Sequence, residues 1–289
     1  MAACRLQQVA QVALRDDGGF LSIPASIAGH PVRLMIDTGS DAGLITPQAV
    51  GGLGLASDPN VHVRLLGTGG AGRSTAIARV RGLTIGSLPL DDVLMPVGPL
   101  PGAPQLDPPV VGFLGGDVLS QFDLEIDVRG STLTLYRVSL PSLACAEPPA
   151  WKPPFEAIPL AMHGVQLSLT VTLDGHRISA LLDTGARSRI LSRAAALRIG
   201  VPPDRLAADP GGITSGVDMR EQVYSWHRFH RLTIGDDVIR SPVLTVAPLY
   251  EPFDMLLGTD WLAGREAWIS YATSQVFLRA SVTDAAGSR

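Results

Sequence analysis

The sequence predicts a mostly β protein built from two similar lobes in one chain. Three observations carry this prediction: a long internal repeat, short apolar runs that end at glycine-containing turns, and a proline-rich stretch between the two copies. The chain has 289 residues, of which 46% are hydrophobic and 17% charged, so it is long and apolar enough to bury two cores.

The repeat becomes visible when the sequence is shifted by 146 residues, which places residues 21–40 over residues 167–186 without a gap. Seven residues are identical in this alignment, including the Asp-Thr-Gly triplets that begin at Asp37 and Asp183. After a slip of three residues, LTIG at 83–86 lies over LTIG at 232–235, and FLGGDVL at 113–119 later matches LLGTDWL at 256–262. The repeat is therefore one whole domain, present twice.

Within each copy the local patterns predict strands and two short helices. FLSIPASI and LSLTVTL are strand-like, and the AGHP and DGHR segments that follow predict hairpin turns shaped by His30 and His176. VRLMI and ISALL then lead to the two Asp-Thr-Gly triplets. TPQAVGGLGL and SRAAALRIG predict short helices closed by glycine, and a second short helix is expected near GGDVLSQF and GTDWLAG.

The repeat also predicts the domain limits. We expect an N-terminal arm at residues 1–20, a first lobe at 21–140 and a second lobe at 156–280. The proline-rich residues 141–155 lack periodicity and are expected to form a linker, and residues 281–289 a flexible tail.

Composition excludes some classes of function and leaves the compartment open. The net charge of −4, with no basic run, argues against nucleic-acid binding, and no apolar run is long enough to span a membrane. The letters AAC, ending at Cys4, resemble the end of a bacterial lipoprotein signal, so we expect a periplasmic or exported protein, with a cytoplasmic one as the alternative. Cys4 and Cys145 are expected to form a disulfide; a lipid-bearing Cys4 or two free thiols are the rival hypotheses.

The two aspartates are the candidate catalytic residues. A carboxylate after an apolar run is costly to bury unless it is paired, and Asp37 and Asp183, in equivalent settings, are each other's natural partner. Two carboxylates about 3 Å apart share a proton. The ionised one can then take a proton from a water while the protonated one hydrogen-bonds a substrate carbonyl. We expect the residues that follow to support the pair, and a hydroxyl near Asp37 to make Asp37 the charged member; these supporting residues are Thr38, Gly39, Ser40, Thr184, Gly185 and Ala186.

Asp-Thr-Gly after apolar residues, with a later apolar-apolar-Gly, resembles the aspartic protease family, and ALLDTGA is especially similar to the active-site segment of the retropepsins. The resemblance covers about Leu21 to Arg279. It implies a monomer with two fused retropepsin-like β-barrel lobes related by a pseudo-two-fold axis, no cofactor, and a peptide or protein substrate. It also implies two glycine-rich flaps, which the repeat places at LGTGGAGRS and GGITSGVDM; the flap residues are Thr68, Gly69, Gly70, Thr214, Ser215 and Gly216.

Other interpretations remain at this point or carry less weight. A non-catalytic relative would bind a peptide in the same cleft without cutting it, and a zymogen would need residues 1–19 removed. The GTGGAG segment at 67–72 fits a dinucleotide-binding pattern, but a strand rather than a helix is expected after it. His227 and His230 would face opposite sides of a strand, so we interpret them as surface residues and expect no metal site.

Overall fold

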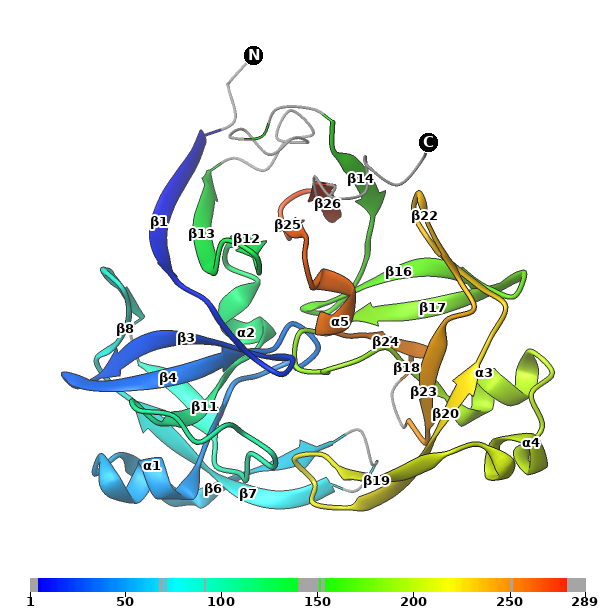
Figure 1. Cartoon of the computed structure of the whole chain (residues 1–289). Helices are drawn as coiled ribbons and strands as arrows, with labels where there is room; N and C mark the ends of the chain where they lie inside the picture. The colour runs from blue at the N-terminus through cyan, green and yellow to red at the C-terminus, as the bar shows by residue number, and fades with distance from the viewer. Residues whose placement is uncertain are drawn as a thin grey trace.

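The computed structural model of the chain describes residues 5–67, 70, 72–90, 92–139, 151, 154–249 and 252–279. Within this part the protein is mostly β, with a few short helices. Figure 1 shows two lobes side by side, with one sheet above both and a pair of long hairpins below them.

The first lobe contains a seven-stranded sheet in the order β5-β11-β4-β3-β8-β9, with β2 added to β3, and a three-stranded sheet in the order β10-β7-β6. Its elements are β2 (Arg15–Asp17), β3 (Phe20–Ile27), β4 (His30–Ile36), β5 (Leu44–Ile45), α1 (Pro47–Gly52), β6 (Ala56–Leu66), β7 (Gly72–Val80), β8 (Leu83–Ile85), β9 (Leu88–Leu90), β10 (Val93–Pro96), β11 (Val110–Leu114) and α2 (Gly116–Leu119).

The second lobe joins the equivalent strands into one ten-stranded sheet, in the order β19-β20-β23-β18-β24-β17-β16-β21-β22, with β15 added to β16. Its elements are β15 (Ala161–His163), β16 (Gln166–Leu173), β17 (His176–Leu182), β18 (Ile190–Ser192), α3 (Arg193–Arg198), α4 (Pro203–Ala208), β19 (Gly211–Ser215), β20 (Glu221–Arg228), β21 (Arg231–Ile234), β22 (Asp237–Arg240), β23 (Val243–Ala247), β24 (Met255–Leu257) and α5 (Thr259–Leu262).

A six-stranded sheet is shared by the two lobes, in the order β1-β13-β12-β25-β26-β14. Its strands are β1 (Arg5–Ala13), β12 (Asp123–Asp127), β13 (Thr132–Ser139), β14 (Glu156–Pro159), β25 (Glu266–Ser270) and β26 (Gln275–Arg279). The lobes meet where Leu124 of β12 pairs with Ile269 of β25. Residues 5–17, expected to be an arm, instead form β1 and β2, and β1 buries Ala10 and Val12 in the core. Cleavage at residue 19, as a zymogen would need, would remove both strands.

The local signals for turns and helices are confirmed in both lobes. Residues 28–29 and 174–175 form two-residue hairpin turns with positive φ throughout, the geometry that Asp-Gly favours. Thr46 caps α1 by accepting a 3.3 Å hydrogen bond from the backbone of Ala49, and its repeat equivalent Ser192 caps α3 by accepting one of 3.0 Å from Ala195. Helix α4 was not expected. It has no counterpart in the first lobe, where the equivalent stretch belongs to β6.

Candidate active site

The two aspartates stand at equivalent strand ends. Asp37 follows β4, which pairs in parallel with β11, and Asp183 follows β17, which pairs in parallel with β24. The backbone N–H of Asp37 donates to the carbonyl of Leu114 at 3.0 Å, and that of Asp183 donates to Leu257 at 3.1 Å. The apolar residues before each aspartate are buried in the core, so the carboxyls emerge where the strands end.

Each loop presses its glycine against the carboxyl group of the other lobe. A methyl group on Gly39 would lie 2.5 Å from Cγ of Asp183, and one on Gly185 would lie 2.5 Å from Oδ2 of Asp37. Glycine is required at both places because no side chain fits there. The packing of the two loops therefore brings the two predicted catalytic aspartates together.

Backbone donors orient both carboxylates in the same way. Oδ1 of Asp37 accepts hydrogen bonds of 3.1 Å from the N–H groups of Gly39 and Ser40. Oδ1 of Asp183 accepts bonds of 2.9 and 3.1 Å from Gly185 and Ala186. These four bonds hold the carboxyl groups in a fixed orientation at the junction of the two lobes.

The two carboxyl groups titrate as a coupled pair. Burial raises the pKa of Asp37 well above its usual range, and the negative charge of Asp183 raises it further. Burial also raises the pKa of Asp183, but its two backbone hydrogen bonds and the bond from Asp37 oppose this shift. The pKa of each carboxyl is therefore raised, and the two groups share a proton. The Ser40 hydroxyl, which was expected to make Asp37 the charged member, donates instead to the carbonyl of Ala42 at 2.9 Å, so which aspartate carries the charge stays a prediction.

The two threonines lock the loops together. The Thr38 hydroxyl donates to the carbonyl of Leu182 at 2.7 Å and accepts the N–H of Thr184 at 3.1 Å. The Thr184 hydroxyl donates to the carbonyl of Ile36 at 2.8 Å and accepts the N–H of Thr38 at 3.0 Å. Both side chains are buried, and all four bonds cross from one lobe to the other.

We call these four hydrogen bonds of Thr38 and Thr184 the threonine lattice. Further contacts between the lobes surround it and were not predicted from the sequence. The Gln166 side chain donates to the carbonyl of Gly39 at 2.5 Å. On the other side, Nε of Arg187 donates to Gly18 at 2.7 Å and the Thr259 hydroxyl donates to Gly19 at 2.9 Å. Each lobe thus holds the loop or hairpin turn of its neighbour. No local pattern marks these residues, because each contact joins positions far apart in the sequence.

Two apolar clusters at repeat-equivalent positions stand apart from the main core. The first consists of buried Met35, Leu44 and Phe113, with partly buried Phe20, Leu65, Leu100, Val110 and Val217 against them. The second consists of Leu181, Ala186, Phe253 and Leu256, with Ile190 and Leu249. Met35, Leu44 and Phe113 correspond to Leu181, Ile190 and Leu256 in the repeat. One cluster therefore adjoins each aspartate loop.

The described residues of the two glycine-rich segments belong to two hairpins, β6–β7 and β19–β20, which meet at Gly67 and Asp218. A methyl group on Gly67 would lie 2.8 Å from Cγ of Asp218, and Val217 packs into the apolar cluster of the first lobe. Gly70 has φ of 78°, which favours glycine. Thr214 and Ser215 lie in β19 and Gly216 follows it, whereas Thr68 and Gly69 lie outside the described residues.

Several other predicted features can now be placed. The strand β7 follows GTGGAG, as expected, so the segment has no helix to present to a phosphate. His227 is not a surface residue: it is buried on β20, with Nδ1 2.6 Å from Oδ2 of Asp209. Within the described part of the chain no cluster of three or more His, Cys, Asp and Glu side chains could hold a metal ion. Cys4 and Cys145 lie outside the described residues, so the disulfide stays a prediction.

One tyrosine beside the pair was also missed. Tyr271 follows β25 and is buried, and its hydroxyl has no hydrogen-bond partner in the described structure. Burial raises its pKa, and the charge of Asp37 raises it further. Nothing in the sequence around Tyr271 marks it, because its counterpart in the first lobe is Val128.

Comparisons with known proteins agree with this geometry. The pattern of the family described as aspartyl protease matches residues 23–118 and 169–261, which together make up more than half of the chain. The chain therefore belongs to the aspartyl protease family. The two matched stretches are the two lobes, and the predicted fold class, a mostly β protein with two retropepsin-like lobes, is confirmed.

Two solved structures illustrate the likeness. The crystal structure of basic 7S globulin from soybean is 11% identical, with a TM-score of 0.52 over 98% of this chain and 97% of that one. The crystal structure of a retropepsin-like aspartic protease from Rickettsia conorii is 21% identical, with a TM-score of 0.32 over 47% of this chain and 96% of that one. A search of curated protein sequences returns no match. Among the described residues, no helix is both long and apolar enough to cross a bilayer.

Proposed function

We propose that this protein is an aspartic endopeptidase that hydrolyses peptide bonds with a water activated between Asp37 and Asp183. The observation that carries the proposal is the carboxyl pair itself. Each carboxyl is held by two backbone N–H groups, and a lattice of threonine hydrogen bonds fixes the two loops against each other. If Asp-Thr-Gly served only to form a turn, a second carboxyl beside it would not be needed. Here Asp183 lies close enough to raise the pKa of Asp37.

The pair supplies both groups that the reaction needs. Asp183 takes a proton from the water as general base, and Asp37 donates its proton toward the carbonyl oxygen of the scissile bond. The water oxygen bonds to the carbonyl carbon and gives a tetrahedral intermediate without a covalent bond to the protein. The nitrogen then takes the proton from Asp183, the C–N bond breaks, and a hydroxyl of the intermediate returns its proton to Asp37, so that the pair is again singly protonated.

The surroundings support an extended peptide as substrate. The two apolar clusters lie beside the aspartate loops, so we expect apolar side chains on both sides of the scissile bond. The hairpin tips touch through Gly67 and Asp218, and we propose that they act as paired flaps that open to admit the peptide and exclude water from the pair once closed.

One chain supplies both halves of the site, so we propose a functional monomer. The lobes share a sheet and exchange the threonine bonds within a single chain. A second subunit would add no missing group. Sedimentation at the concentration of the assay tests this proposal, and activity that disappears on dilution together with a dimer would contradict it.

The test of the activity is incubation with a mixed peptide library at acidic and neutral pH, with and without pepstatin, followed by mass spectrometry. We expect internal cleavage between apolar residues that pepstatin blocks and that an Asp183→Asn protein lacks. Peptides retained by the wild-type protein but left uncut under all conditions would instead support the non-catalytic binding role. Cleavage that survives in Asp183→Asn would contradict the assignment of the pair.

A further inference from the structure

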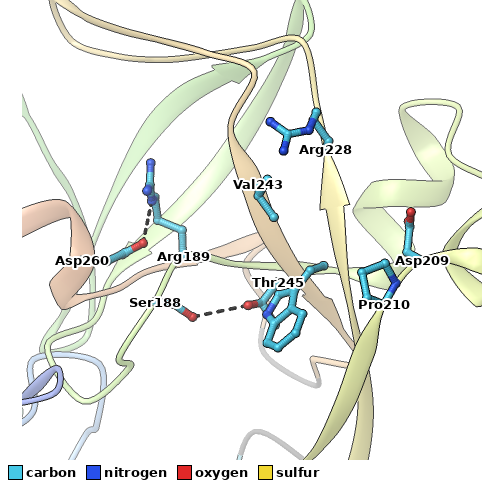
Figure 2. Close-up of a pocket in the computed structure, with 9 residues that line it drawn as sticks. Ser188, Arg189, Asp209, Pro210, Arg228, Val243, Thr245 and Asp260 are labelled. Carbon is cyan, nitrogen blue, oxygen red and sulfur yellow. Dashed lines mark hydrogen bonds and ion pairs between the residues drawn. The ribbon is translucent and has the colours of Figure 1, made fainter.

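A pocket of about 580 Å³ lies in the second lobe and takes no part in the proposed chemistry. One wall belongs to the β20–β23 ladder, and the other comes from Ser188, Arg189 and Asp260. Trp226 pairs with Thr245 and Arg228 with Val243, so these four side chains share one face of the ladder. Figure 2 shows Ser188, Arg189 and Asp260 on one side, Asp209 and Pro210 on the other, and Arg228 at the upper edge between them.

The walls of the pocket belong to elements that lead to the aspartates and to the second hairpin. Ser188 and Arg189 belong to the loop that leads from Asp183 into β18, and Asp260 lies on α5, which supports that loop through a 2.9 Å bond from the N–H of Thr259 to Ala186. The opposite wall, β20, is the returning strand of the second hairpin. A peptide that leaves the aspartates beneath this hairpin would pass between the two walls.

The pocket is lined by two arginines and two aspartates, and among them Arg228 is the cation without a salt-bridge partner in the described part of the chain. Asp260 is paired with Arg189 through a 2.8 Å contact, and Asp209 is held by buried His227. Arg228 donates to the carbonyl of Ser241 at 3.1 Å, and no carboxylate within the described part of the chain forms a salt bridge with it. A guanidinium in this state is suited to bind a carboxylate, with which it forms paired hydrogen bonds.

The equivalent place in the first lobe lacks these features. Ala42 and Gly43 stand where the second lobe has Ser188 and Arg189, and Ile77 stands in place of Trp226. Arg79 corresponds to Arg228, but its guanidinium is paired with Asp92 at 3.0 Å. The two lobes therefore differ at this place, although their aspartate loops are nearly alike.

We propose that this pocket is a subsite for an acidic side chain of a bound peptide, remote from the scissile bond, with Arg228 as the group that binds the carboxylate. Trp226 supplies an apolar face for the methylene groups, because 45% of this residue is exposed. The proposal rests on the peptide-binding cleft of the proposed function. It adds that the enzyme binds peptides in one direction, set by the position of the acid.

The test uses the uncleaving Asp183→Asn chain and blocked octapeptides with a central Leu-Phe pair, serine elsewhere, and glutamate replacing one serine at a time. Calorimetry should find one position, on one side of the centre, where glutamate binds about tenfold more tightly than serine, the size expected for a charge-assisted hydrogen bond. Lysine at that position should give no gain. Trp226, the most exposed of the four tryptophans, should change its emission only with that peptide.

Matched arginine variants locate the effect. Arg228→Gln should abolish the glutamate preference, and Arg79→Gln, at the equivalent place in the first lobe, should leave it intact. A preference below twofold at every position, a preference for lysine, or equal losses in both variants would overturn the proposal. Wild-type cleavage of the same peptides is measured separately. Cleavage without dependence on Arg228 would refute the subsite alone, and binding dependent on Arg228 without cleavage would refute the peptidase alone.

Discussion

Replacing Thr38 by valine tests how much the threonine lattice stabilises the junction between the lobes. Valine keeps the branched shape and volume but removes the hydroxyl. The carbonyl of Leu182 then loses the donor that lies 2.7 Å away, and the N–H of Thr184 loses the acceptor that lies 3.1 Å away. Thr38 has no exposed surface, so water does not replace these partners.

The expected cost follows from the two groups left unpaired. A buried polar group without a partner costs about 1–3 kcal/mol, so Thr38→Val should lower the free energy of unfolding by about 3 kcal/mol. That is a large share of the roughly 5–15 kcal/mol that holds a typical domain folded. Thr184→Val removes the two equivalent bonds and should cost the same within about 0.5 kcal/mol. Thr38→Ser keeps both bonds and should cost about 1 kcal/mol for the lost methyl group.

Urea unfolding followed by circular dichroism measures these differences. The matched control is Thr134→Val, which is equally buried but whose hydroxyl accepts only a 3.3 Å bond from Gln11, and which should cost less than about 1 kcal/mol. The reasoning is refuted if Thr38→Val unfolds at the wild-type urea concentration. It is also refuted if Thr38→Ser is as unstable as Thr38→Val, because the hydroxyl would then not be the source of stability.

Three further predictions concern Asp37, Tyr271 and the glycines of the two hairpins. Because the folded pKa of Asp37 is raised, its burial costs nothing at low pH and destabilises the fold as pH rises past about 3.9, the ordinary value. Asp37→Asn should therefore raise the melting temperature more at pH 7 than at pH 3, and equal gains would contradict this. Tyr271→Phe removes a buried hydroxyl without a partner and should leave stability unchanged or raise it by about 1 kcal/mol; a clear loss in thermal unfolding would mean that the hydroxyl is bonded. Gly216→Val should lower kcat/KM at least about tenfold without shifting the urea midpoint, because a lid must change backbone angles to close. Gly70→Val should lower kcat/KM similarly and also lower the urea midpoint, because φ of 78° at Gly70 is strained for valine. Hydrogen exchange in both hairpins should slow on binding pepstatin, and protection of only one would indicate a single flap.

Much of the fold was predictable because its signals are local and occur twice. The hairpin turns at residues 28–29 and 174–175 need positive φ, which favours the glycine found at the second position of each turn. The caps Thr46 and Ser192 and the apolar runs before each aspartate likewise act on their own neighbours. Each Asp-Thr-Gly triplet alone is a moderate signal for catalysis. Because the repeat places Asp37 and Asp183 at equivalent positions, the two together predict one shared site.

The features that escaped prediction depend on residues distant in sequence. Strand β1 pairs with β13, so that residue 5 lies opposite residue 139. The residue pattern within β1 does not indicate which strand it pairs with. The Gln166 and Arg187 contacts exist only because the lobes pack together. The Ser40 hydroxyl was expected to lie near Asp37 but bonds the carbonyl of Ala42. His227 was expected on the surface but is buried, because α4 covers that face of β20.

The most direct test of the account is the combined effect of the two aspartates on one cleaved peptide. Initial rates are measured for the wild type, Asp37→Asn, Asp183→Asn and the double variant, with folding of each checked by circular dichroism. If the carboxyls form one unit, either single change lowers kcat/KM to background and the double change lowers it little further. Substantial activity in one single variant, or losses in the two variants that simply multiply, would contradict the shared proton and the water activated between Asp37 and Asp183.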